Sequence, residues 1–155
     1  MPMNRVLTYL DAQDAAYEVI AHRIDYTSQE TAADTHTPGR EFAKNVLLGT
    51  PAGVAMAIVP AIHKIDLEKV RQGLGTNQVR LADEAMMSEL CPDCDPGAIP
   101  PFGNLYDIPV YVDPTLTGDE FITFNGGTHE SAIRMRYCDF ERLVHPTIMD
   151  MVEGA

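Results

Sequence analysis

An apolar run with a lysine in its middle, residues 41–48, constrains the fold of this chain most. Read as a strand, the run alternates its side chains between two faces. Lys44 then shares the more apolar face with Phe42 and Leu48. Poor solvation of an ammonium among such neighbours lowers its pKa, and the position suits an anionic ligand or reaction centre. The alternative is that Lys44 lies at a sheet edge and its stem reaches water.

The segments around this strand predict its partners. A turn at residues 49–53 followed by an apolar run at 54–59 predicts a hairpin, and Asn125-Gly126-Gly127 predicts a second. Further strands are predicted at residues 17–20, 79–81 and 109–113, and helices begin near Asn4, Ser28, Asp66, Asp83 and Asp139. We therefore expect one α/β domain over residues 1–155. Its mixed, mostly antiparallel sheet is expected to be partly closed into a barrel and flanked by helices.

Composition excludes several classes of partner. The chain has 155 residues, with 23 Asp and Glu against 11 Lys and Arg and a formal net charge of -12. Such a charge repels long nucleic-acid backbones, so we expect no DNA binding, although a short nucleic-acid end can still enter a local positive pocket. The sequence has no run of about 18 apolar residues and no signal-type N-terminus. We therefore expect no membrane association and a cytoplasmic location.

Three cysteines without an export signal argue against a disulfide framework. Cys91 and Cys94 have the spacing of half a zinc site or of a redox pair, but no second such pair follows. A metal would need Cys138 or a distant histidine as a further ligand. Turn-forming residues around the pair favour an ordinary loop with two unliganded thiols, so we expect no metal and no cofactor.

A stiff segment at residues 92–103, the Pro/Gly loop, contains four prolines and two glycines. It cannot form a helix or a central strand, so some of its backbone N–H groups stay outside regular pairing. Free amides beside glycines, which let a ligand approach closely, build pockets for carbonyl and phosphate oxygens. The alternative is a tight structural connection.

The familiar catalytic templates are missing, because the sequence has no GxSxG elbow, no GxxxxGK[ST] phosphate loop and no HExxH helix. The histidines have no diagnostic local spacing to Ser or Cys, and most are expected to be surface or capping residues; they are His22, His36, His63, His129 and His145. His129 is the least ordinary, since it follows the Gly126-Gly127 turn. What remains is Lys44 and the Pro/Gly loop. Together they can hold an activated ester, with loop amides on its carbonyl oxygen and the lysine near a phosphate or carboxyl oxygen.

Three segments carry a resemblance to a known family. They are Glu30-Thr31-Ala32-Ala33 with the run from His36 to Lys44, then Gly97-Ala98-Ile99-Pro100-Pro101-Phe102-Gly103, then Gly126-Gly127-Thr128-His129 leading to Asp139-Phe140. In this order and spacing they resemble the YbaK/ProX family of aminoacyl-tRNA deacylases, which includes the editing domain inserted in bacterial prolyl-tRNA synthetase. The similarity runs from about Tyr17 to Val144.

The resemblance implies hydrolysis of the ester that joins a mischarged amino acid to the terminal adenosine of tRNA. Lys44 matches the functional lysine of the family, and the loop that lines the aminoacyl pocket is matched by Gly97, Pro101 and Gly103. The further substrate-binding residues expected are Phe102, His36, Gly127 and His129. The implied partners are the acceptor end of aminoacyl-tRNA and an aminoacyl-tRNA synthetase that acts as a carrier.

The implied mechanism needs no protein nucleophile. A water positioned by loop backbone and by the substrate's own ribose hydroxyl attacks the ester, and pocket size selects the amino acid. Pro100 departs from the family pattern, which usually has Ser or Thr there, and so removes a hydroxyl and an N–H. The departure and the acidity leave an alternative open, a non-catalytic ligand-binding or regulatory module that keeps the pocket. A metal-dependent enzyme that uses Cys91 and Cys94 is a third reading.

Overall fold

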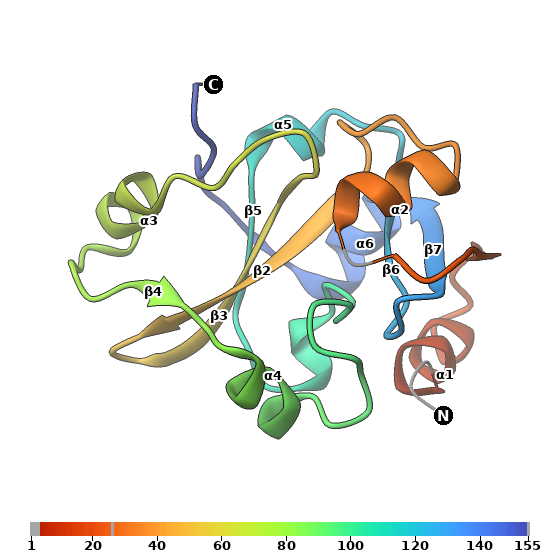
Figure 1. Cartoon of the computed structure of the whole chain (residues 1–155), viewed down its shortest axis with the longest axis horizontal. Helices are drawn as coiled ribbons and strands as arrows, with labels where there is room; N and C mark the ends of the chain where they lie inside the picture. The colour runs from red at the N-terminus through yellow and green to blue at the C-terminus, as the bar shows by residue number, and fades with distance from the viewer. Residues whose placement is uncertain (1–3, 26, 155) are drawn as a thin grey trace.

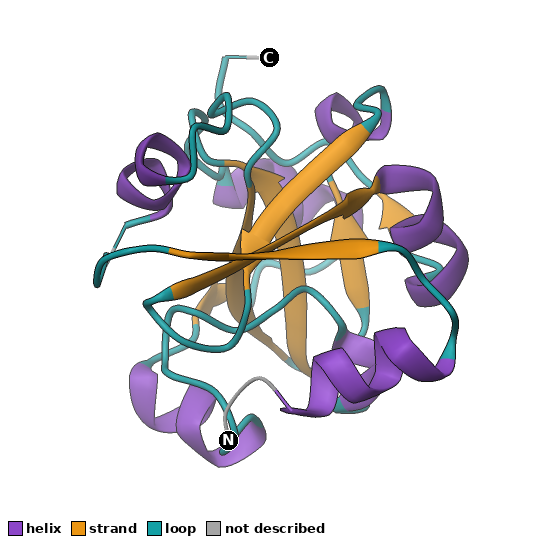
Figure 2. Ribbon diagram, turned by 90° about the vertical axis from the view of Figure 1, so that its right-hand side faces the viewer, coloured by secondary structure: helices purple, strands orange, loops and turns teal. Residues whose placement is uncertain are grey.

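Two β-sheets lie at the centre of the computed structural model, which describes residues 4–25 and 27–154, and helices surround them (Figure 1, Figure 2). The smaller sheet has the strand order β1 (Tyr17–Ala21), β7 (Ser131–Arg136), β6 (Phe121–Asn125). The larger sheet has the order β4 (Arg80–Leu81), β2 (Ala43–Thr50), β3 (Gly53–Pro60), β5 (Val110–Val112), β8 (Thr147–Ile148). The expected α/β class is confirmed, and the lysine-bearing strand is β2.

The expected barrel is wrong. The two sheets stay separate in the described part of the chain, and an isolated bridge between Phe42 and Thr123 links them. The reason lies in the connections: β5 and β8 join the larger sheet in parallel on the β3 side. On its other side, β2 finds a strand partner among the described residues only at Leu48 and Gly49, which pair with β4. The edge of β2 is therefore left open rather than closed onto another strand.

Both predicted hairpins are present. β2 and β3 pair antiparallel along their whole length, from Ala43 opposite Pro60 to Thr50 opposite Gly53. β6 and β7 also pair antiparallel, up to Asn125 opposite Ala132, so their connection is longer than a two-residue turn. Local turn chemistry thus predicted the pairing of β6 with β7 but not the length of their connection.

The helices are α1 (Asn4–Ala12), α2 (Ser28–Asp34), α3 (Leu67–Leu74), α4 (Glu84–Leu90), α5 (Pro114–Thr117) and α6 (Tyr137–Val144), with a 3₁₀ turn at Gly103–Leu105. Asp66 and Asp83 cap α3 and α4. Ser28 is the first residue of α2 and not its cap, because Thr27 and Glu30 form a capping box there. Asp139 likewise lies in the first turn of α6, whose N-cap is Arg136.

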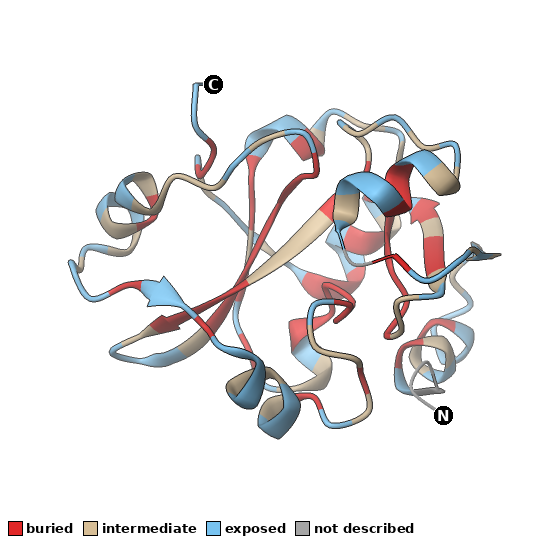
Figure 3. Ribbon diagram, viewed as in Figure 1, coloured by how far each residue is buried: buried red, intermediate tan, exposed pale blue. Residues whose placement is uncertain are grey.

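Most of β3 and β6 is buried (Figure 3). The main core takes residues from both sheets, including Met56 and Ile58 of β3 and Phe124 of β6, whereas Ala57 and Val59 of β3 pack into a second, smaller cluster on the other face. The aromatic centre of the main core is Phe102, whose ring centroid is 5.6 Å from that of Phe124 and 5.6 Å from that of Phe140. The Pro/Gly loop therefore contributes to the core as well as to the surface. Within the described residues, no helix is both long enough and apolar enough to cross a lipid bilayer.

Candidate active site

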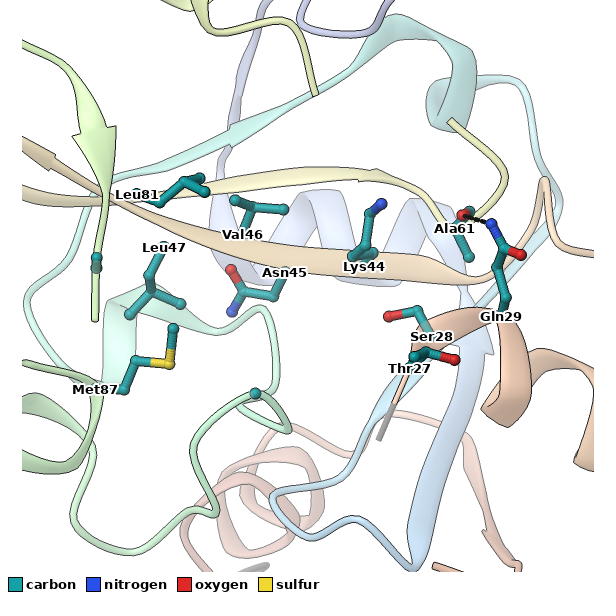
Figure 4. Close-up of a pocket in the computed structure, with 12 residues that line it drawn as sticks. Thr27, Ser28, Gln29, Lys44, Asn45, Val46, Leu47, Ala61, Leu81 and Met87 are labelled. Atoms are coloured by element: carbon teal, nitrogen blue, oxygen red, sulfur yellow. Dashed lines mark hydrogen bonds between the residues drawn. The ribbon is translucent and has the colours of Figure 1, made fainter. Parts of the chain in front are cut away.

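A hollow of about 540 Å³ lies against the open edge of β2 (Figure 4). We call it the edge hollow; it is lined by Thr27, Ser28, Gln29, Lys44, Asn45, Val46, Leu47, Ala61, Leu81, Ala82, Met87 and Gly97. Three parts of the fold build its walls: the start of α2, the segment from β4 to α4, and the Pro/Gly loop at Gly97. Among its described lining residues, Lys44 carries the only charged side chain.

Lys44 lies at the sheet edge, yet its side chain is only half-exposed. Its Nζ donates a hydrogen bond to the carbonyl oxygen of His63 at 2.9 Å. Burial lowers the pKa of the Lys44 ammonium below its usual value. The edge hollow thus offers one partly desolvated positive charge, which favours an anionic group of a ligand.

Asn45 points to the opposite side of β2 from Lys44 (Figure 4). Its Nδ2 donates to the carbonyl oxygens of Ile99 at 3.1 Å and Pro100 at 3.4 Å, so it ties the Pro/Gly loop to the strand. Its Oδ1 is buried and has no hydrogen-bond partner among the described residues. Asn45 is not among the site residues expected from the sequence. The available signal was an amide inside an apolar strand, which needs a partner when buried.

The Pro/Gly loop is divided between the edge hollow and the core. Gly97 lines the hollow and has a φ of 85°, whereas Pro101, Phe102 and Gly103 are buried. A Cβ at Gly103 would collide with the carbonyl oxygen of Ile108, so this glycine is needed for close packing. The structure therefore brings Gly97 to the edge hollow, together with Lys44. The other three expected loop residues are buried and do not line the hollow.

Gly127 and His129 hold the Pro/Gly loop from the other side. The Gly127 N–H donates to the carbonyl oxygen of Ala98 at 2.9 Å, and its own carbonyl accepts from the Asp95 N–H at 2.8 Å. His129 Nε2 lies 3.0 Å from the carbonyl oxygen of Pro96. These contacts fix the backbone on either side of Gly97.

A family profile decides what kind of domain this is. The profile of the aminoacyl-tRNA editing domain matches residues 22–143, which include every wall of the edge hollow. The chain belongs to the aminoacyl-tRNA editing domain family. No match was found among curated proteins.

Several solved structures share the fold of this editing domain. A candidate trans-editing enzyme for prolyl tRNA synthetase has a TM-score of 0.87 at 22% identity, with 99% of this chain and 98% of that one covered. The hypothetical protein APE2540 has a TM-score of 0.85 at 20% identity, with 96% and 99% covered. A candidate signal transduction protein from Marinobacter aquaeolei VT8 has a TM-score of 0.71 at 19% identity. The match covers 95% of this chain and 30% of that one.

His36 of the editing domain does not line the edge hollow. It follows α2 with a φ of 53° and is exposed. It lines a separate hollow of about 340 Å³ whose charged residues are Glu18, Glu41 and Arg134. Its place beyond the C-terminal end of α2 therefore separates it from Lys44.

Cys91 and Cys94 of the editing domain are both buried. Cys94 Sγ lies 3.4 Å from the hydroxyl oxygen of Tyr106, which donates to the Asp93 carboxylate at 2.9 Å. Burial raises the pKa of Cys91 to about 12 and that of Cys94 to about 11. In the described part of the chain, no group of three or more His, Cys, Asp or Glu is arranged to hold a metal ion.

Proposed function

We propose that this editing domain hydrolyses the ester bond of mischarged aminoacyl-tRNA. The observation that carries the proposal is the charge of the edge hollow. In a chain of formal net charge -12, the hollow is lined by one ammonium, Lys44, and otherwise by uncharged described residues. A phosphate or carboxyl oxygen near the terminal adenosine is the kind of group that such a site attracts.

The reaction is an addition of water to the ester carbonyl followed by loss of the ribose oxygen. The water oxygen bonds to the carbonyl carbon, the carbon–oxygen bond to the ribose breaks, and the ribose oxygen takes up a proton. The products are free amino acid and uncharged tRNA. Lys44 is proposed to hold the nearby anionic oxygen, and the backbone at Gly97 to contact the aminoacyl group.

The proton acceptor for the water is proposed to be on the substrate. The described lining of the edge hollow includes no His, Asp, Glu or Cys side chain, so it presents no usual general base. Its polar side chains besides Lys44 are hydroxyls and amides, from Thr27, Ser28, Gln29 and Asn45. This lining agrees with a water held by loop backbone and by the neighbouring ribose hydroxyl.

The partner is proposed to be the acceptor end of tRNA and not its whole length. A volume of about 540 Å³ lies in the range that small ligands occupy, which suits an aminoacyl group with part of its ribose. The acidic surface disfavours a long phosphate backbone. A synthetase that carries the tRNA would overcome that repulsion, and the walls of the hollow would reject larger amino acids by size.

A panel of mischarged tRNAs tests the proposal directly. The purified chain is incubated with each labelled aminoacyl-tRNA, and release of the amino acid is followed against a buffer blank. Hydrolysis of at least one member is expected, and it should fall when the terminal adenosine lacks its free ribose hydroxyl. Binding of aminoacyl-tRNA without turnover on any member would instead support the non-catalytic module.

A further inference from the structure

The main chain of β2 is itself exposed at the edge hollow. Four consecutive strand residues, Lys44 to Leu47, line it, although their side chains alternate between the two faces of the sheet. A hollow can touch both faces of one strand only where it lies against the strand's edge. The backbone between the side chains therefore forms part of its floor.

The hydrogen bonds at both ends of β2 tell which backbone groups point outward. Phe42 accepts from Ala61, on the β3 side, at 2.9 Å. Glu41 instead accepts from Thr123, and Leu47 from Ala82, both on the side away from β3. Because strand backbone groups alternate in direction, the odd-numbered residues of this stretch present N–H and C=O to the open edge.

Asn45 is the odd-numbered residue whose outward-pointing backbone N–H and C=O face the edge hollow, outside the stretch of β2 that pairs with β4. Its paired strand residue is Ile58 of β3, on the inner side. On the outer side, no described residue gives a hydrogen bond to its carbonyl or accepts one from its N–H. An open N–H and C=O on one strand residue are the two groups that bind an opposing residue in an antiparallel sheet.

We propose that the aminoacyl group of the substrate binds Asn45 as a single opposing strand residue; this rests on the proposed function. The α-ammonium donates to the Asn45 carbonyl oxygen, and the ester carbonyl oxygen accepts from the Asn45 N–H. The second hydrogen bond polarises the carbonyl that water attacks. Recognition of the amino acid therefore comes from main-chain groups, which do not depend on the identity of its side chain.

The same pairing selects the configuration at the α-carbon. Directly opposed residues of an antiparallel pair project their side chains to the same face. An L-amino acid thus directs its side chain to the face where the Asn45 amide reaches Ile99 and Pro100. A D-amino acid would direct it to the face of Lys44, whose ammonium is poorly compatible with an apolar group.

Non-hydrolysable amides of 3′-amino-3′-deoxyadenosine test the inference by binding alone. The L-alanyl amide carries the smallest chiral aminoacyl group, and the propionyl amide differs from it only by lacking the ammonium. Calorimetry is expected to show roughly 10- to 100-fold weaker binding for the propionyl amide, the loss for one charge-assisted hydrogen bond. The D-alanyl amide is also expected to bind at least about tenfold more weakly. Equal affinities of the three compounds would overturn the inference.

Asn45→Pro supplies the protein-side test. Proline removes the outward N–H but no hydrogen bond to β3, which is the kind of edge position where proline is tolerated. Asn45→Ala is the matched control, because it loses the same side-chain amide and keeps the N–H. The proline variant is expected to bind the L-alanyl amide about tenfold more weakly than the alanine variant does. If the proline variant does not fold, as judged by circular dichroism, the wild-type protein supplies the test. The ¹⁵N chemical shift of its Asn45 amide is expected to change when L-alanyl amide is added.

The two proposals fail in different ways. Selective binding of the L-alanyl amide without hydrolysis of any tRNA would overturn the proposed function and leave the main-chain pairing standing. Hydrolysis of aminoacyl-tRNA with equal affinity for the alanyl and propionyl amides would overturn the pairing alone. An unmoved Asn45 amide resonance at saturating L-alanyl amide would also overturn it.

Discussion

Lys44 Nζ donates to the carbonyl oxygen of His63 at 2.9 Å, so the connection after β3 holds the ammonium beside the open edge of β2. An ammonium has three N–H donors, and one of them is used in this contact. The other two are available to an anionic oxygen of a ligand. The contact therefore positions the charge without neutralising it.

Lys44→Met is predicted to remove most of the deacylase activity and to leave the fold intact. Methionine keeps the apolar stem of the half-buried side chain and deletes its charge. We expect the rate of amino-acid release to fall roughly 100-fold, the scale for losing one group that stabilises developing charge. Lys64→Met is the matched control, since Lys64 is exposed and does not line the edge hollow. A comparable loss in the control would contradict a specific role for Lys44.

The pH dependence of stability gives a second test of Lys44. Burial lowers its pKa below the usual 10.5, so the folded protein releases this proton at a lower pH than the unfolded chain does. Between the two pKa values the free energy of unfolding therefore rises with pH. Urea unfolding at a series of pH values rising to 10.5 should show wild type gaining stability relative to Lys44→Met. The opposite trend would mean that the ammonium gains more from His63 than it loses by burial.

The hairpin of β2 and β3 could be predicted from sequence because its signals are local. An apolar alternation, a glycine-containing turn and a second apolar run fix both the elements and their pairing. β8 (Thr147–Ile148) has no such signal, since it is two exposed residues that pair in parallel with β5. The absence of a barrel could not be predicted from local signals either, because it depends on which side of β3 the later strands join.

The candidate site shows the same division between local and distant information. Lys44 and Gly97 could be selected as site residues from their chemistry and their neighbours in sequence. For Asn45 the sequence offers only the sign that an amide inside an apolar strand needs a partner, and the partners themselves, Ile99 and Pro100, lie more than fifty residues away. The structure also changes the interpretation of Pro100. It contributes a buried carbonyl oxygen that accepts from Asn45 and from the Phe102 N–H at 2.8 Å, so the loop is held by its backbone at this position.

Asn45 is predicted to stabilise the Pro/Gly loop through its donor. Asn45→Ala leaves two loop carbonyls without the amide and should lower the free energy of unfolding by about 1–2 kcal/mol. Asn45→Asp should cost about 3 kcal/mol or more, because a carboxylate would face the carbonyl oxygens of Ile99 and Pro100. Urea unfolding of the two variants measures the difference. An aspartate variant as stable as the alanine variant would show that the amide does not act as a donor.

Thiol reactivity is predicted to separate Cys138 from the other two cysteines. Cys138 is exposed, whereas burial raises the pKa of Cys91 to about 12 and that of Cys94 to about 11. Thiolates react and thiols do not, so at pH 8 the native protein should release one equivalent of colour from a disulfide reagent such as DTNB. Cys138→Ser should abolish that rapid phase, and all three thiols should react in denaturant. Rapid reaction of a second thiol in the native protein would contradict the buried environment of the pair.

Gly97 and Gly103 are predicted to respond differently to the same substitution. Gly103→Ala places a Cβ against the Ile108 carbonyl oxygen and 2.6 Å from Val110 Cγ2, so the core must shift and about 3 kcal/mol or more should be lost. Within the described part of the chain, the Cβ of Gly97→Ala meets only His129 Cε1, at an ordinary 3.5 Å, and its cost of about 1–2 kcal/mol comes from the left-handed backbone.

Per folded molecule, deacylation is expected to be affected in the opposite order, more by Gly97→Ala than by Gly103→Ala. Relief of the strain at Gly97 moves backbone that lines the edge hollow, so the deacylation rate per folded molecule should fall with Gly97→Ala. The folded fraction of Gly103→Ala, selected by adding a stabilising osmolyte, should keep most of its rate, because this glycine packs behind the hollow. A rate loss confined to Gly103→Ala would place the reacting ester deeper in the loop than Gly97.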